Sequence, residues 1–196
     1  MNFQEYNDYI QSILSKDPSS QTPPYNQEDY YKYTKLNASR MKRWLKTGVI
    51  HPELQSALAQ IQSPQQWIVI TEPWCGDAAH SVPFMQLAAS QNPHITLSFE
   101  LRDSEPYRIL SYLTGKSKSI PKLIIQDVSG NDLAVWGPRP AECQVIYDKL
   151  IEEKADFETI ITQLQNWYNE NEGKDIQLEI AGKLTSITPV NTVQNP

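Results

Sequence analysis

The chain has 196 residues, of which 39% are apolar, so it is long enough for one α/β domain with an extension. Its net charge of −6 and its pI near 5.1 argue against nucleic acid or an anionic membrane surface as a partner. No apolar run approaches the roughly 20 residues of a membrane span, the N-terminus lacks a signal-peptide pattern, and two cysteines make no disulfide framework. We therefore expect a cytoplasmic protein with reduced thiols.

Helical patterns occupy the first part of the chain. Apolar residues recur at helical spacing over residues 2–14, and the same spacing predicts a second helix over residues 27–47. Residues 16–27, which are rich in Pro and Ser, are predicted to be a linker. Pro52 is well placed to begin a third helix. We predict that residues 1–51 form an N-terminal helical extension.

The next stretch carries the chemistry. Residues 67–71 form a short apolar and β-branched run that predicts a buried strand, and Pro73 ends it because proline cannot donate to a sheet. A helix then starts beside Cys75, where unpaired backbone N–H groups and the helix dipole favour thiolate over thiol. Asp77 acts in the opposite direction, because a neighbouring carboxylate raises the pKa of a thiol. These residues alone leave that balance open.

The rest of the chain alternates between strand and helix patterns. The predicted elements are a helix containing Pro83, a strand at 95–101, a helix from Ser104 to Gly115, a strand after Pro121, a turn at 129–132, an edge strand at 133–136, helices at 141–153 and 156–168, and a short strand at 177–180. We predict a main domain over residues 52–172 and a C-terminal tail over residues 173–196. The part of this tail beyond residue 183 is expected to be disordered.

Four motifs give the chain a resemblance to a known family. Trp74-Cys75-Gly76-Asp77-Ala78 stands where the thioredoxin superfamily has Trp-Cys-Gly-Pro-Cys between a strand and a helix. Ser119-Ile120-Pro121-Lys122-Leu123 resembles the segment in which thioredoxins place a cis-proline against the active cysteine. With Arg102-Asp103 and Trp136-Gly137-Pro138-Arg139-Pro140, the chain is similar to a bacterial thioredoxin-like family with a single cysteine in the motif. The resemblance covers roughly residues 52–168 and implies an α/β thioredoxin-like fold, with a central mixed sheet and helices on both faces.

The resemblance also implies a site at the carboxyl ends of the parallel strands, where open α/β sheets gather functional groups. Cys75 is the candidate catalytic residue. The candidate supporting and substrate-binding residues are Trp74, Gly76, Asp77, Arg102, Asp103, Ile120, Pro121, Gly137 and Arg139. Such a surface suits a peptide or glutathione, because an extended backbone can pair beside Pro121 and an arginine can hold a carboxylate. In a second interpretation, Arg102 and Asp103 only pair with each other, and Arg139 only braces its loop.

Two functions follow from this site. In the first, the protein is a single-cysteine thiol-disulfide oxidoreductase in which Cys75 attacks protein or glutathione mixed disulfides. Glutathione or another external thiol would complete the cycle, because Ala78 cannot act as a second thiol. In the alternative, the protein is a non-catalytic thioredoxin-fold module that binds a peptide or protein, and Cys75 is an ordinary or buried thiol.

Other residue types add little to this choice. Cys143 is predicted to be a plain, half-buried thiol far from the site, because free cysteine packs like a small apolar residue. The three histidines are scattered, with no carboxylate or cysteine at ligand spacing, so no metal site is predicted. No bound cofactor is expected.

Overall fold

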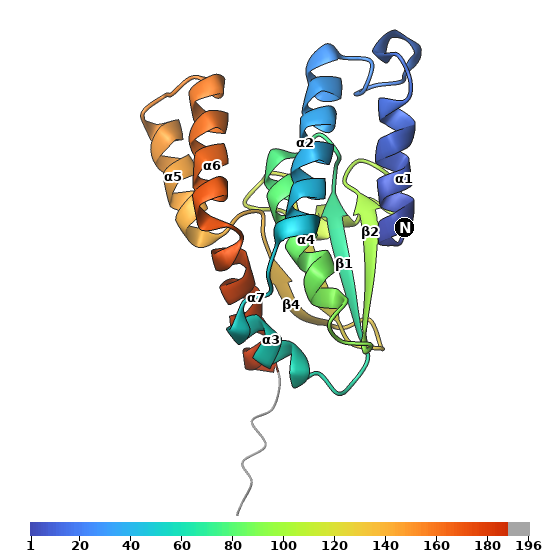
Figure 1. Ribbon diagram of the computed structural model, residues 1–196, viewed down its shortest axis with the longest axis vertical. Helices are drawn as coiled ribbons and strands as arrows, with labels where there is room; N and C mark the ends of the chain where they lie inside the picture. The colour runs from blue at the N-terminus through green and yellow to red at the C-terminus, as the bar shows by residue number, and fades with distance from the viewer. Residues whose placement is uncertain (188–196) are drawn as a thin grey trace, which may run out of the picture.

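A four-stranded mixed sheet forms the centre of the molecule in the computed structural model, which describes residues 1–187 (Figure 1). The strand order is β2-β1-β3-β4; β1 runs parallel to β2, and the other two pairs are antiparallel. The strands are β1 (Gln65–Thr71), β2 (Ile95–Leu101), β3 (Lys122–Gln126) and β4 (Asp132–Trp136). The predicted mixed α/β fold class is therefore confirmed.

Seven α-helices accompany the sheet over the described residues. They are α1 (Phe3–Leu14), α2 (Glu28–Thr47) and α3 (Pro52–Ala59) before β1, α4 (Gly76–Ala89) between β1 and β2, and α5 (Ala141–Glu152), α6 (Phe157–Asn171) and α7 (Lys174–Ile187) after β4. In the described part of the chain, none of these helices is both long and apolar enough to cross a membrane.

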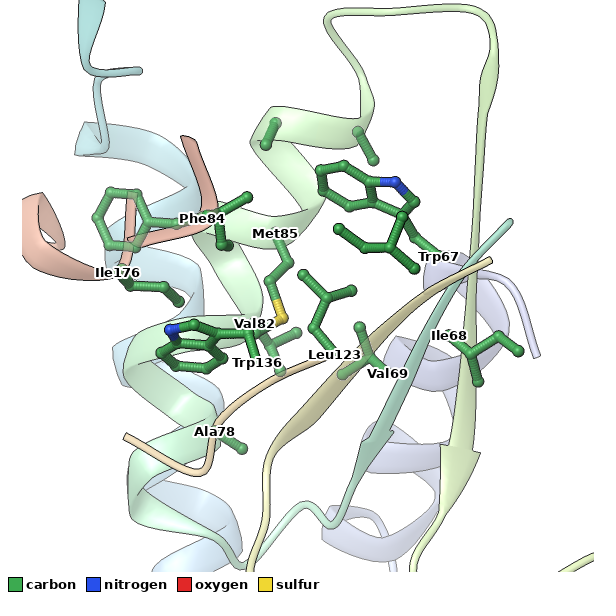
Figure 2. Close-up of a cluster of buried hydrophobic side chains, with 14 of the residues drawn as sticks. Trp67, Ile68, Val69, Ala78, Val82, Phe84, Met85, Leu123, Trp136 and Ile176 are labelled. Carbon is green, nitrogen blue, oxygen red and sulfur yellow. The ribbon is translucent and has the colours of Figure 1, made fainter. Parts of the chain in front are cut away.

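Helix α4 fixes the position of the segment that carries the sequence motif. Figure 2 shows Val82 and Met85 of α4 beside Val69 of β1 and Leu123 of β3, and all four side chains are fully buried. Burial of an apolar side chain of this size stabilises a fold by about 1.5–3 kcal/mol. Because β1 and α4 share this core, the turn that joins them, which contains Cys75, is held from both sides.

The N-terminal helices predicted from the sequence are present and packed against the rest of the molecule. Tyr6 of α1 stacks on Phe99 of β2 with ring centroids 5.0 Å apart. Trp44 of α2 donates its indole N–H to Nδ1 of His80 on α4 at 2.9 Å. The linker between α1 and α2 is anchored by Tyr25, which is buried. These contacts place α2 beside α4, the helix that begins directly after Cys75.

Residues 104–115 do not form the predicted helix. Within them, only the four residues Arg108–Ser111 form a short 3-10 turn. Pro106 disfavours helical conformation at the residue before it, and Tyr107 has a left-handed φ of 55°. The turn still buries Ile109 completely. The prediction was wrong because Pro106 and the left-handed Tyr107 interrupt the helix that the apolar spacing alone predicts.

The C-terminal segment contains a helix instead of the predicted strand at residues 177–180. The side chains that α7 buries against the core recur every four residues, at Ile176, Ile180 and Leu184. A four-residue window did not reveal this helical period. Residues 184–187, where disorder was predicted, belong to α7, and residues 188–196 lie outside the described residues. The domain boundaries after residues 51 and 172 stay predictions.

Two glycines test how tightly this C-terminal helix is docked. A Cβ at Gly173, whose φ is +76°, would lie 2.2 Å from the Phe84 ring, whereas a Cβ at Gly182 of α7 would meet nothing within 4 Å. Gly173→Ala should therefore lower the free energy of unfolding by about 2–4 kcal/mol, through backbone strain and overpacking. Gly182→Ala should raise it by about 0.5–1 kcal/mol, because alanine is the better helix former. Urea titrations would measure both changes, and a neutral Gly173→Ala would contradict the packing of α6 and α7 on α4.

Candidate functional site

Cys75 lies between β1 and α4, at the N-cap position of the helix. Its φ and ψ are −77° and 118°, and its side chain makes no capping hydrogen bond. Instead, Sγ donates to the carbonyl oxygen of Ile120, with an Sγ···O distance of 3.4 Å. Only 7% of the residue is exposed. The thiol therefore points inward, against the segment that precedes β3.

The surroundings of Cys75 favour the thiol over the thiolate. Burial, and next the carboxylate of Asp77, raise the pKa of Cys75 to about 12. The backbone N–H groups of Ala78 and Asp77 and the charge of Arg139 act in the opposite direction but do not outweigh them. The helix start does lower the pKa of Cys75, as expected, but the balance that the sequence left open falls on the side of the thiol. Burial is the largest cause, and it arises from packing that the sequence alone does not show.

A buried clasp, made of Asp77, Arg139 and Tyr168, surrounds the first turn of α4. One carboxylate oxygen of Asp77 pairs with Nη2 of Arg139 at 2.9 Å, and the other accepts from the Tyr168 hydroxyl at 2.9 Å. The side chains of Asp77 and Arg139 are only 11% and 15% exposed. Although burial lowers the pKa of Arg139, the net shift is upward because of Asp77 and Tyr168, so the guanidinium keeps its charge.

Arg139 also joins the clasp to α5. Its Nη1 donates to Oε1 of Gln144 at 3.0 Å, and its guanidinium carbon lies 4.1 Å from the centre of the Tyr147 ring. These contacts occupy the guanidinium from several sides. Arg139 thus braces its loop, while its buried Nε has no hydrogen-bond partner among the described residues.

The loop after β4 presses on Pro121. Gly137 has a φ of +111°, and a Cβ there would lie 2.2 Å from the Pro121 carbonyl oxygen, so only glycine fits this approach. The buried ammonium of Lys122 donates to the Gly137 carbonyl at 2.9 Å and to Oγ1 of Thr114 at 2.8 Å. The Ile120–Pro121 peptide bond is cis. This arrangement ties together the chain segments before β3 and after β4.

The outer rim of the site is aromatic and basic. The guanidinium of Arg102 lies 4.7 Å from the centre of the Trp74 ring, and Tyr30 of α2 packs edge-on against the same ring at 5.3 Å. Arg102 also pairs with Asp103, which has a second, longer contact with Lys118 at 3.6 Å. Arg102 and Asp103 therefore form the strand-end ion pair of the second sequence interpretation.

An unpaired stretch of backbone runs along this rim. The N–H groups of Ser119 and Ile120 have no backbone partner within residues 1–187. Ser119 is half-buried, and Lys118 before it is exposed. Because β3 begins only at Lys122, the residues directly before Pro121 are not paired in the sheet, although Ile120 is buried and its carbonyl oxygen accepts from Cys75. Such an edge can pair with another extended chain.

The structure joins the sequence-predicted site residues, apart from Gly76, through five contacts. Cys75 contacts Ile120, Gly137 contacts Pro121, Asp77 pairs with Arg139, and Trp74 packs on Arg102, which pairs with Asp103; Gly76 is exposed at the start of α4. Their chemical roles stay a proposal. In the described part of the chain, no three His, Cys, Asp or Glu side chains are grouped so that they could hold a metal ion.

Three residues of the site were missed by sequence reasoning. Tyr168 lies in the predicted helix at 156–168, but nothing in the sequence links it to Asp77. Tyr30 lies in the predicted helix at 27–47, but nothing in the sequence links it to Trp74. Glu72 was interpreted only as the end of a strand, but it is 6% exposed, accepts from the Tyr25 hydroxyl and the Asp103 N–H, and has a pKa raised by burial. All three residues reach the site through contacts between segments far apart in the chain, which the sequence alone does not show.

Cys143 lies closer to the site than predicted. It is fully buried rather than half-buried, in a small cluster that also contains Tyr168. Burial and then Asp77 raise its pKa to about 12, so it is influenced by the carboxylate that also acts on Cys75. The sequence placed it on the correct helix but could not show that α5 packs on α6, which carries Tyr168.

Comparisons with known proteins agree with this fold. A family model described as thioredoxin matches residues 24–154, a range that includes α2 and the whole sheet. A protein of unknown function from Pseudomonas aeruginosa has a similar structure, with a TM-score of 0.55, 15% identity, and coverage of 95% of this chain and 98% of that one. An HIV epitope-scaffold has a TM-score of 0.53, 17% identity, and coverage of 95% and 99%. These structural likenesses concern the fold alone. The search of curated proteins gave no match.

The clasp can be tested through stability. Asp77→Asn and Arg139→Gln should each lower the free energy of unfolding by roughly 2–4 kcal/mol, because each leaves a buried charge without its partner. The double variant should lose at least about 1 kcal/mol less than the sum of the two. As a control, Glu28→Gln and Lys32→Gln, which neutralise the two residues of an exposed ion pair, should each change stability by less than about 1 kcal/mol. Additive losses at residues 77 and 139 would show that the pair is not coupled.

Proposed function

The chain belongs to the thioredoxin family, and on this premise we propose that it is a binding module that holds an extended peptide segment of a partner protein. The observation that carries this proposal is the state of Cys75, which is 7% exposed and donates its thiol hydrogen to Ile120. With a pKa of about 12, the fraction of thiolate at pH 7 is on the order of 10⁻⁵. A thiol in this state is poorly suited to attack a disulfide.

The second position of the motif supports the same conclusion. A dithiol enzyme releases its mixed disulfide with a second thiol about one helical turn from the first. Here that position is Ala78, which is buried. The other cysteine, Cys143, is fully buried and has an equally raised pKa. Neither residue offers a reactive second thiol in the described structure.

The proposed ligand is held by its main chain. An extended peptide would add a strand beside Ser119 and Ile120, whose N–H groups have no backbone partner among residues 1–187. Trp74, half-buried between Tyr30 and Arg102, would contact an apolar side chain of that peptide. Arg102 and Arg139 already have carboxylate partners, so recognition would depend more on the backbone and on Trp74 than on these guanidinium groups.

A second candidate function is thiol-disulfide exchange on protein or glutathione mixed disulfides. The observation in its favour is that the N–H groups of Ala78 and Asp77 and the charge of Arg139 all lower the pKa of Cys75, so that a thiolate, once formed, has donors ready. The thiolate would attack one sulfur of the disulfide, and the other sulfur would leave as a thiolate. An external thiol such as glutathione would then displace Cys75 from the mixed disulfide. Neither candidate needs a bound cofactor, and both fit a cytoplasmic protein with reduced thiols.

Alkylation of Cys75 separates the two candidates. In a Cys143→Ser variant, iodoacetamide should modify Cys75 roughly a thousandfold more slowly than a free cysteine at neutral pH, because the pKa of about 12 stands well above the free value of about 8.5. The rate should rise about tenfold per pH unit up to at least pH 9. The same protein unfolded in guanidinium is the control and should react at the free rate. A rate that levels off below pH 8.5 would support the exchange reaction instead.

Peptide binding tests the proposed function itself. Random linear peptides displayed on phage should yield binders to the wild-type protein, and Trp74→Ala should weaken their binding at least about tenfold, because it removes the rim's aromatic contact. Phe157→Ala removes an exposed ring from the surface of α6 and serves as the matched control, which should leave binding unchanged. Failure to select any peptide, or equal loss in both variants, would contradict a peptide site beside Pro121.

A further inference from the structure

The arginines of this chain divide into two groups. The sequence contains five. Three of them pair with a carboxylate: Arg102 with Asp103, Arg108 with Glu100 and Arg139 with Asp77. The other two, Arg40 and Arg43, lie on α2, and neither contacts a carboxylate within residues 1–187. Because the protein has a net charge of −6, two arginines three residues apart, neither paired with a carboxylate within residues 1–187, are unusual.

Arg40 is the more unusual of the two, because it is half-buried. Its Nη1 donates to Oδ1 of Asn37 at 2.9 Å, and its Nε and Nη2 have no hydrogen-bond partner in the described structure. Burial and the nearby charge of Arg43 both lower the pKa of Arg40, and the only group that raises it is the Tyr33 phenol. A guanidinium that loses part of its hydration normally gains an anionic partner in return. Among residues 1–187, no carboxylate takes that place.

Neutral hydrogen-bonding groups surround the two guanidinium groups. Arg43 donates to the Asn169 amide oxygen of α6 at 2.7 Å and lies over the ring of Trp44. Burial, and to a smaller extent the charges of Arg40 and Arg43, lower the pKa of His80 to about 4, so His80 is neutral at pH 7. Both of its ring nitrogens are already engaged, with Trp44 and Gln165. The hydrogen-bond partners of Arg40 and Arg43 are thus neutral amides, and neither guanidinium forms an ion pair within residues 1–187.

We propose that this pair of arginines binds an oxyanion between α2 and α6, with the free edge of the Arg40 guanidinium as the main contact. A planar guanidinium with two unused N–H groups matches two oxygens of a phosphate or of a carboxylate. Arg43 adds positive charge but not a second two-pronged hydrogen-bonding edge, because its Nη2 already donates to Asn169. The ligand class is thus a small oxyanion or an oxyanion group of a larger molecule.

The oxyanion site lies next to the candidate peptide site but does not depend on it. Asn37, which holds Arg40, also donates to the carbonyl oxygen of Pro73 at 3.1 Å, directly before Trp74. An anion on Arg40 would therefore sit one helical turn along α2 from the Cys75 turn. The proposal rests on the arginines alone, so it stands or falls separately from peptide binding.

Thermal unfolding of the full chain tests the proposal. Inorganic phosphate and acetate are each added at pH 7, and sodium chloride at equal ionic strength is the reference, so that general screening cancels. We expect an oxyanion present at ten times its dissociation constant to raise the melting temperature by about 3–6 °C. A rise with phosphate alone identifies a phosphate-type group, and a rise with acetate as well identifies a carboxylate as sufficient.

The variants assign the effect to Arg40. Arg40→Gln should abolish the rise, and Arg40→Lys, which keeps the charge but loses the planar fork, should reduce it by at least half. Lys42→Gln makes the same charge change at an exposed position of α2 and should leave the rise intact. Circular dichroism would verify that each variant is folded. The proposal is overturned if neither anion exceeds chloride in the wild-type protein, or if Arg40→Gln and Lys42→Gln lose the rise equally.

Discussion

The ion pair between Asp77 and Arg139 is the interaction on which the candidate site depends. It joins the first turn of α4 to the loop after β4, and Tyr168 adds α6 to the same carboxylate. Through Arg139 the loop is held so that Gly137 lies against Pro121, and the segment before Pro121 meets the Cys75 thiol. Burying such a pair stabilises little by itself, because desolvation offsets much of the attraction. Its main effect is to fix the geometry of four chain segments.

Burial, reinforced by the same carboxylate, explains why a thiol-enzyme motif here surrounds a protonated cysteine. A helix N-terminus is worth about 0.3–1 kcal/mol, which is less than one pKa unit. Full burial can raise a pKa by several units, and Asp77 adds a negative charge beside Cys75. The sum favours the thiol. A thioredoxin fold can therefore keep the position of the cysteine and its contact with the segment before Pro121 while losing the reactivity that the motif suggests.

The sequence predicted the sheet and the residues of the site better than it predicted their state. Strand β1 contains the predicted strand Trp67–Thr71, and β3 begins directly after Pro121 as expected. Both predictions succeed because apolar runs and prolines act on the chain locally. The burial of Cys75, the contact of Tyr168 with Asp77 and the partial burial of Arg40 all arise from packing between distant segments, which local patterns do not encode. The helix expected after Ser104 was wrong because Pro106 and Tyr107 overrode an apolar spacing. The strand expected near Gln177 was wrong because the helical period of α7 appears only over a longer window.

The most direct test of the account is the ionisation of Cys75 itself. In a Cys143→Ser variant with ¹³Cβ-labelled cysteine, the chemical shift of Cys75 Cβ can be followed by NMR from about pH 6 to about pH 10, where a free thiol titrates near pH 8.5. We expect no titration step in this range, because the thiol is buried, donates to Ile120 and lies within the influence of the Asp77 charge. A step centred below pH 8.5 would contradict it and would identify Cys75 as a thiolate nucleophile.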